Sequence, residues 1–377
     1  MSGFLLGRIR GIEVQAHWSL AVVAWLLTWS LATSVFPSLV PDHTDEAYWV
    51  AAGLTALAFL AGLLAHEMGH SIVAQRHGLG VRSITLWLFG GVARLESEPA
   101  DPGAALRIAA AGPAVSVALG IAGVAAALVA GDTLGGAALL WFGSMSLLLA
   151  VFNLLPAFPL DGGRIYQAWI WRRTGDRGAA TRRAAGAGRV IGAGMIGLGL
   201  LEALAGGLLG GLWLVMLGWF LREAGQSEVA HSRVAPFVEQ LTVADVMSPE
   251  PVVAHAADRL DAFAEARFHG GRHAAYPVLD EHSQVVGLLS INALRETPRD
   301  AWQTRTVAEC MAPVRDLVVV ESTSALAALL CALEDNPEGR ALVVDGGGLV
   351  GIVAPSDIAR LISLVEVASR PLDPAPS

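Results

Sequence analysis

Charged side chains are scarce in this sequence of 377 residues, where Asp, Glu, Lys and Arg together make up 16%. Soluble domains contain roughly 25% charged residues, so the shortage argues against an ordinary soluble protein. Hydrophobic residues supply 54% of the chain, and the mean hydropathy is +0.54. Residues 1–225 are dominated by Ala, Gly, Leu and Val, whereas 238–370 has the composition of a soluble α/β domain. The composition therefore predicts a membrane protein with a soluble C-terminal part.

Cysteine and basic residues are also few. The two cysteines, Cys310 and Cys331, lie in the soluble part and match no metal-ligand spacing. A disulfide framework is therefore implausible, and free cytosolic thiols are expected. The 25 Lys and Arg residues are outnumbered by 34 Asp and Glu residues, which gives a net charge of -9. Because binding of a phosphate backbone needs clustered Lys and Arg, no nucleic-acid partner is expected.

Apolar runs long enough to cross a bilayer occur six times, since about 20 apolar residues span the hydrocarbon. The first run follows Arg8 and Arg10 and is longer than a signal-peptide core of about 7–15 residues, so we expect it to be retained as a transmembrane helix. Several runs are rich in Gly and Ala, which lets helix backbones approach closely. The six predicted spans are 17–36, 48–74, 105–130, 136–157, 187–205 and 207–221.

Arginines predict the orientation in the membrane. With six spans, one side receives the acidic segment 37–47 and the short loop at Asp132. Loops rich in Lys and Arg stay in the cytoplasm, so the N-terminus and the soluble part are predicted to be cytoplasmic in a multi-pass protein of the cell membrane. The arginines that fall on the other side are Arg8, Arg10, Arg76, Arg82, Arg164, Arg172, Arg173, Arg177, Arg182 and Arg183.

Residues 81–95 are β-branched and aromatic, with a predicted turn at Gly90-Gly91, and so favour a β-hairpin over a helix. An open sheet edge cannot face lipid, so the hairpin must lie at the interface or inside the protein. The predicted fold class is an α-helical polytopic membrane protein with about six transmembrane helices and an interfacial β-hairpin, followed by a C-terminal α/β module. The transmembrane domain is predicted at 1–225 and a polar linker at 226–240.

The soluble part contains a repeat of about 60 residues. Thr242-Val-Ala-Asp-Val-Met-Ser-Pro matches Thr306-Val-Ala-Glu-Cys-Met-Ala-Pro, and Val286-Gly-Leu-Leu-Ser matches Val350-Gly-Ile-Val-Ala. The pair resembles a tandem of cystathionine-β-synthase-type (CBS) domains. The predicted boundaries are 241–300 for the first domain, 301–366 for the second and 367–377 for a disordered tail.

The string His66-Glu67-Met68-Gly69-His70 lies inside the second predicted span. Positions i and i+4 share one face of a helix, so His66 and His70 can present ring nitrogens to one metal ion. Zinc lowers the pKa of bound water to about 7, and Glu67 is placed to take the proton of that water. Incidental histidines are the alternative, but an ionisable group at mid-bilayer costs roughly 2.5–3.5 kcal/mol and usually has a function. We therefore predict one zinc ion (Zn2+) per chain.

A third ligand is needed, because catalytic zinc usually has three protein ligands and a water. Asp161 is the candidate, at the end of the string Asn153-Leu-Leu-Pro-Ala-Phe-Pro-Leu-Asp161 that follows an apolar span. Pro156 and Pro159 break the helix there, and irregular backbone at this depth is tolerated only inside protein or beside a wet cavity. A plain interfacial turn is the alternative for Asp161 and its two following glycines, and the His-Glu string favours the ligand.

Together these two strings resemble the site-2 protease family of intramembrane metalloproteases, in the subgroup with six spans and a C-terminal CBS pair. The resemblance covers nearly the whole chain and implies that His66, His70 and Asp161 bind zinc while Glu67 is the general base. It implies regulated intramembrane proteolysis of a transmembrane protein substrate within the lipid bilayer, such as an anti-sigma factor or a precursor protein. It also implies that Asn153 binds substrate or stabilises the oxyanion, and that the hairpin edge pairs with an unwound substrate.

CBS domains often bind adenine nucleotides through a Gly-hydrophobic-hydrophobic-Thr/Ser-x-x-Asp string. The first repeat keeps the hydroxyl at Ser290 but has Ala293 for the acid, and the second keeps Asp357 but has Ala354 for the hydroxyl. Nucleotide binding therefore stays open, and Asp357 serves equally well as a helix N-terminal residue. A homodimer through the CBS domains is a further expectation.

Two other functions compete with proteolysis. Buried His and Asp in membrane helices also mark ion pathways, which would suit a metal-ion transporter or channel. That class needs no Glu beside the first His and usually distributes polar groups along several spans, whereas here they concentrate in two places. A catalytically inactive membrane sensor is the other alternative, and the intact set of four polar residues argues against it.

Single cysteines at Asp42, Asp132 and Gly175, in a background lacking Cys310 and Cys331, test the predicted orientation. A membrane-impermeant thiol reagent added to intact cells should label the first two positions and spare the third, because arginine-rich loops remain cytoplasmic. Labelling at position 175 alone would invert the orientation.

Overall fold

The computed structural model describes residues 3–368 except Phe89, Glu96, Glu239, 269–272, 334–335 and Pro337. The chain divides into two units, Met1–Ala230 and His231–Ser377. The first unit contains the predicted transmembrane spans and the second contains the predicted repeats. Most of the predicted tail at 367–377 lies outside the described residues.

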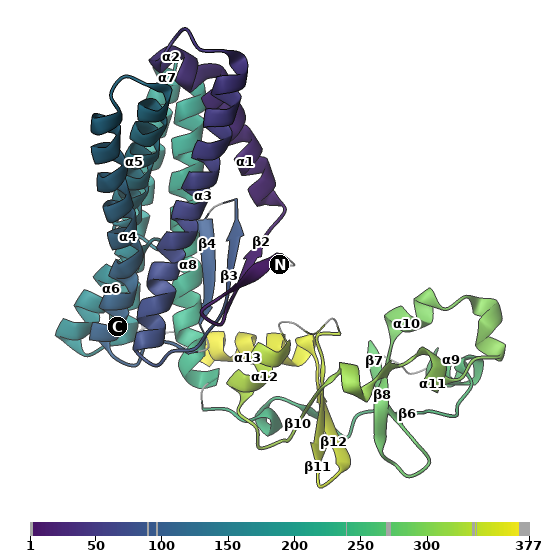
Figure 1. Ribbon diagram of the computed structural model, residues 1–377. Helices are drawn as coiled ribbons and strands as arrows, with labels where there is room; N and C mark the ends of the chain where they lie inside the picture. The colour runs from purple at the N-terminus through teal and green to yellow at the C-terminus, as the bar shows by residue number, and fades with distance from the viewer. Residues whose placement is uncertain are drawn as a thin grey trace. The chain divides into compact units, whose positions relative to one another are not determined.

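In the part of the chain that the structure describes, six helices are long and apolar enough to cross a membrane, as the sequence predicts (Figure 1). The first crossing joins α1 (Ser19–Ser30), a π-helical turn (Leu31–Val35) and α2 (Phe36–Leu39). A shorter helix, α6 (Asp161–Thr174), was not predicted. The other crossings are α3 (Asp45–Arg76), α4 (Pro102–Ala130), α5 (Leu134–Asn153), α7 (Arg177–Leu204) and α8 (Leu208–Val238). Because α8 runs to Val238, most of the predicted linker is helical.

Short polar residues begin four of these helices. Their side-chain oxygens accept hydrogen bonds from backbone N–H groups of the first turn, which otherwise have no partner in the helix. At the far end of α6, Gly175 has a φ of +73°, a left-handed conformation that favours glycine and ends the helix. The capping residues are Thr44 before α3, Asp101 before α4, Thr133 before α5 and Asp176 before α7.

Helices α4 and α5 approach each other at glycines. A Cβ on Gly143 of α5 would lie 2.6 Å from the backbone nitrogen of Val124 and 2.8 Å from the carbonyl oxygen of Gly120 in α4. Because these neighbours are backbone atoms, a larger residue would force the helices apart. The predicted close packing of Gly-rich spans is confirmed at this crossing.

A four-stranded sheet lies beside α3 (Figure 1). The predicted hairpin at 81–95 is confirmed as its third and fourth strands. The predicted turn at Gly90-Gly91 is wrong, because Gly90 pairs with Trp87 and Gly91 with Leu86, so both glycines belong to a strand. The strands, in spatial order, are β1 (Phe4–Ile9), β2 (Ile12–Ala16), β3 (Val81–Trp87) and β4 (Gly90–Leu95), with β2 parallel to β3 and the other pairs antiparallel.

The N-terminal strands β1 and β2 were missed by the sequence analysis. Ile12 and Val14 are buried and alternate with polar residues, which is the pattern of a half-buried strand. Ile12 packs in one cluster with Met68 of α3 and Ile84 of β3. The sheet is thus fixed to the helix that contains the His-Glu string.

The second unit is the predicted α/β module and contains two four-stranded sheets, ordered β10-β11-β12-β5 and β6-β7-β8-β9. The strands are β5 (Ser248–Pro249), β6 (Ala254–His255), β7 (Ala275–Leu279), β8 (Val285–Ser290), β9 (Ala312–Pro313), β10 (Val318–Val320), β11 (Ala341–Asp345) and β12 (Gly348–Val353). The helices are α9 (Leu260–Phe268), α10 (Ile291–Glu296), α11 (Val307–Cys310), α12 (Leu326–Leu333) and α13 (Pro355–Ala368), with 3-10 turns at Val243–Asp245, Arg299–Gln303 and Val314–Asp316.

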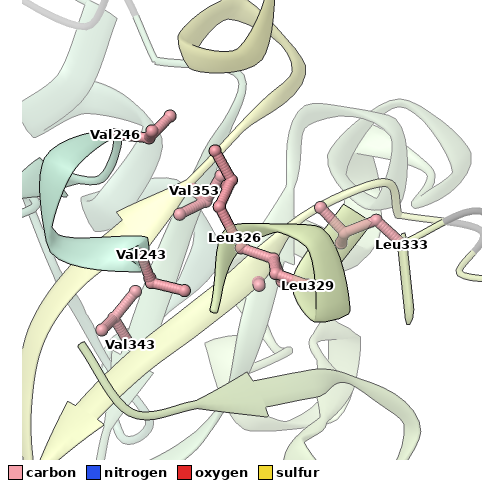
Figure 2. Close-up of a cluster of buried hydrophobic side chains, with 8 residues drawn as sticks. Val243, Val246, Leu326, Leu329, Leu333, Val343 and Val353 are labelled. Carbon is pink, nitrogen blue, oxygen red and sulfur yellow. The ribbon is translucent and has the colours of Figure 1, made fainter. Parts of the chain in front are cut away.

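The two repeats exchange strands. Ser248 of β5, from the first repeat, pairs with Ile352 of β12, and Ala312 of β9, from the second, pairs with Leu288 of β8. The exchange continues in the core, where Val243 packs among side chains of the second repeat (Figure 2). Each sheet therefore needs both repeats, and the predicted boundary near residue 300 separates segments that pack as one unit. The labelled cluster comprises Val243, Val246, Leu326, Leu329, Leu333, Val343 and Val353.

Candidate metal centre

Three side chains from two helices meet in the first unit. Nε2 of His66 lies 3.2 Å from Oδ2 of Asp161, and Nε2 of His70 lies 3.2 Å from Oδ1 of the same carboxylate. The two Nε2 atoms are 3.2 Å apart. His66 is 3% exposed, and His70 and Asp161 are largely buried. The predicted ligand set is thus brought together, although the two strings are about 90 residues apart in the sequence.

The two histidines share one face of α3, as their spacing of four residues requires. That face meets α4 at Gly112, where a Cβ would lie 2.1 Å from Nε2 of His70 and 2.7 Å from Nε2 of His66. A side chain at position 112 would therefore occupy the space in front of both nitrogens. The sequence analysis treated the glycines of these spans only as small residues that allow close packing.

Asp161 is the first residue of α6, directly after the proline-interrupted segment 154–160. A Cβ on Gly162 would lie 2.3 Å from the carbonyl carbon of Leu154, and one on Gly163 would lie 2.6 Å from that of Ala157. These contacts are with backbone and cannot be relieved by a rotating side chain. The Asp-Gly-Gly sequence is therefore not a plain interfacial turn. Its glycines allow the start of α6 to pack closely against the preceding loop, and this packing directs Asp161 towards the histidines.

The outer nitrogens of the histidines also have partners, which the sequence analysis missed. Nδ1 of His70 lies 2.7 Å from the carbonyl oxygen of Ile108, and Nδ1 of His66 lies 2.9 Å from Oγ of Ser116. Both partners belong to α4. Hydrogen bonds at the outer nitrogen orient a ligating imidazole and leave the inner nitrogen for the metal.

The geometry fits a tetrahedral metal ion. Bonds of about 2.0–2.1 Å to zinc place neighbouring donors about 3.3 Å apart. The two Nε2 atoms are 3.2 Å apart, and each lies 3.2 Å from one of the two oxygens of the Asp161 carboxylate, which is close to this value. Two imidazoles and one carboxylate suit zinc and leave a fourth position open for water or substrate. Among the residues that the structure describes, this is the one group of three or more His, Cys, Asp or Glu residues gathered this closely.

Glu67 lies beside the first ligand and beneath strand β4. A Cβ on Gly91 would lie 2.3 Å from Cγ and 2.7 Å from Oε1 of Glu67, so the carboxylate lies against the strand backbone. In the described part of the chain, strand β4 pairs only with β3 and forms one edge of its sheet. The contact explains why glycine occupies position 91 within a strand, and it brings the edge strand next to the predicted general base.

The remaining predicted site residues belong to other helices or strands than the three ligands. Asn153 is the last residue of α5 and is partly exposed. Ser290 is buried and caps α10, where its hydroxyl accepts a hydrogen bond from the backbone N–H of Ala293. Asp357 is 5% exposed and acts as a helix N-terminal residue, accepting a hydrogen bond from the N–H of Ala354.

Both oxygens of Asp357 are engaged. Oδ2 accepts the bond from Ala354, while Oδ1 accepts bonds from Oγ of Ser248 and Nη2 of Arg360, each at 3.0 Å. Ser248 comes from the exchanged strand β5, so Asp357 helps to tie the two repeats together.

Replacing Gly112 by alanine tests the packing that shapes the metal centre. The added Cβ would collide with the Nε2 atoms of both histidines, so we expect zinc to fall from one per chain to below about a tenth, as elemental analysis of purified protein would show. Gly197→Ala is the matched control, because a Cβ on Gly197 of α7 meets no atom within 4 Å. Full zinc occupancy in Gly112→Ala would contradict the geometry.

Comparison with known proteins identifies two families along the chain. Residues 54–137 and 134–196 match the model of peptidase family M50. Residues 243–299 and 307–364 match the CBS domain model, which confirms the resemblance drawn from the repeats. The family matches follow the same division into an N-terminal membrane part and a C-terminal pair of repeats.

Individual relatives match over nearly their whole length. Rip3 of Mycobacterium tuberculosis is 42% identical over 368 residues, covering 96% of this chain and 93% of that protein. Zinc metalloprotease MJ0392 of Methanocaldococcus jannaschii is 30% identical over 363 residues, covering 96% of both. A solved structure of a site-2 protease from Methanocaldococcus jannaschii covers 60% of this chain and 95% of that chain, at 25% identity and a TM-score of 0.41. Because Rip3 and MJ0392 match this chain from end to end at 42% and 30% identity, the chain belongs to peptidase family M50 and has a C-terminal pair of CBS domains.

Proposed function

We propose that this protein is an intramembrane zinc metalloendopeptidase that hydrolyses peptide bonds in or near transmembrane segments of other proteins. The observation that supports this most directly is the meeting of His66, His70 and Asp161 beside Glu67 within a bundle of apolar helices. Membership of peptidase family M50 and the name of the relative from Methanocaldococcus jannaschii agree with this chemistry.

The chain's own residues divide the work of hydrolysis. Zinc, when bound, supplies Lewis-acid activation of water and of the scissile carbonyl. His66, His70 and Asp161 hold it and leave one position open. Glu67 accepts a proton from the attacking water as the oxygen bonds to the carbonyl carbon, and delivers that proton to the nitrogen that leaves when the C–N bond breaks.

Strand β4 supports a specific way of presenting the substrate. Among the described residues no further strand pairs with its outer edge, and at Gly91 its backbone lies against Glu67. A substrate segment that adds to this edge as a further strand would pass directly over the metal centre. Asn153 is proposed to bind that segment or to stabilise the oxyanion. Substrates of the expected kind are membrane-anchored anti-sigma factors or precursor proteins.

The soluble unit is proposed to lie in the cytoplasm, to regulate cleavage and to mediate a homodimer. Adenine nucleotide remains the expected effector, although neither repeat has the full recognition string. Ser290 and Asp357 both act as helix-capping residues, and Asp357 also bonds to Ser248. A nucleotide that bound through Asp357 would therefore compete with a contact between the repeats.

A metal-ion transporter is disfavoured by the distribution of polar groups. Within the described residues, the ligating side chains form one centre and do not continue as a chain of sites across the bundle. A catalytically inactive sensor is disfavoured because His66, His70 and Asp161 lie 3.2 Å from one another and Glu67 directly follows the first of them.

Glu67→Gln separates metal binding from catalysis. The ligands remain, so zinc should stay at one per chain, while loss of the proton acceptor should slow cleavage of a co-reconstituted membrane substrate by about 10²–10⁴-fold. His66→Ala combined with His70→Ala is the control that should lose both zinc and cleavage. Wild-type turnover in Glu67→Gln would rule out the assigned mechanism, and full zinc in the double variant would rule out the ligands.

A further inference from the structure

The two histidines of the metal centre are held by partners of different chemical character. His70 faces the carbonyl oxygen of Ile108, which can only accept a hydrogen bond. Nδ1 of His70 must therefore carry the proton, and Nε2 keeps a lone pair for a metal. His66 faces the hydroxyl of Ser116, which can either donate or accept. This bond is compatible with both tautomers of His66, only one of which can bind a metal through Nε2.

We propose that Ser116 is a positioning residue that orients the His66 ring and accepts the hydrogen bond of its metal-binding tautomer. This inference rests on the proposed function. When Nε2 of His66 binds the metal, Nδ1 carries the proton and the Ser116 hydroxyl accepts it in a hydrogen bond. Ser116 is 1% exposed and His66 is 3% exposed, so removing the hydroxyl leaves a buried N–H group without its acceptor.

The placement of Ser116 on α4 supports this role. Ile108, Gly112 and Ser116 are spaced by four residues and lie along one face of the helix. Ile108 supplies the acceptor for one ring and Ser116 the partner for the other, while Gly112 between them leaves room for both Nε2 atoms. A single stripe of α4 thus sets the orientation of both rings.

A purely structural serine has a different partner in this protein. Ser146 of α5 is also buried, at 4% exposed, but its hydroxyl donates to the carbonyl oxygen of Phe142 one turn earlier in its own helix. The bond of Ser116 instead crosses to a side chain of another helix. Ser146→Ala is therefore a matched control for the loss of a buried helical hydroxyl.

The test measures zinc affinity of the purified full-length chain by competition with a chelator, together with the melting temperature of the metal-free protein. Ser116→Ala should bind zinc about 10–100-fold more weakly than wild type, the usual effect of losing such a partner. Ser146→Ala should keep wild-type affinity, and Ser116→Thr, which retains the hydroxyl, should recover most of the loss. Each metal-free variant should still unfold in one cooperative transition, so that the loss of zinc affinity is measured on folded protein, and Ser116→Thr separates loss of the hydroxyl from a change of shape.

Wild-type zinc affinity in Ser116→Ala would overturn the inference, as would equal losses in Ser116→Ala and Ser146→Ala. Failure of Ser116→Thr to bind more tightly than Ser116→Ala would also overturn it, because shape rather than the hydroxyl would then matter. If wild type binds no zinc, the proposed function fails as well. If wild type binds zinc and cleaves while Ser116→Ala matches it in both, only the role of Ser116 fails.

Discussion

The close approach of α4 to α3 at Gly112 is the contact on which the metal centre depends. It brings a helix backbone within reach of both histidine rings, so that α4 can contact their outer nitrogens while leaving the inner nitrogens free. A second close backbone contact occurs at Gly162 and Gly163, where the start of α6 packs against the loop before it. This contact directs Asp161 into the site. In an apolar bundle, polar ligands need hydrogen-bond partners supplied by the protein, and close backbone contact at glycine brings those partners near.

The sheet adds a second constraint, because it fixes where an extended chain can lie. Ile12 and Ile84 pack against the side of α3 that contains Met68, which holds β3 and therefore β4 over Glu67. A transmembrane helix uses its carbonyl groups in its own hydrogen bonds, so a substrate has to unwind before it can pair with β4. The sheet would thus bind the unwound substrate segment, and the helical bundle would supply the metal centre that cleaves it.

The sequence was sufficient to predict which three side chains meet and insufficient to predict their hydrogen-bond partners. His66, Glu67 and His70 stand out because ionisable residues at helical spacing are rare in apolar spans, and Asp161 because prolines and glycines interrupt a span beside it. Ser116 is one small residue in a helix rich in Ala and Gly, and the carbonyl of Ile108 has no sequence signature at all. Strand β2 does alternate apolar and polar residues, but the alternation covers only five residues directly before a predicted span. The exchange of β5 and β9 between repeats is a long-range pairing that similarity between consecutive segments cannot reveal.

X-ray absorption at the zinc edge of the purified, zinc-loaded protein tests the central claim most directly. The account predicts four nitrogen or oxygen neighbours at about 2.0–2.1 Å, with outer-shell scattering from two imidazoles. The ligands would be His66, His70 and Asp161, with a water or substrate oxygen in the fourth position. A sulfur neighbour at about 2.3 Å would contradict it, because that distance would place the metal at a cysteine instead of at these three side chains.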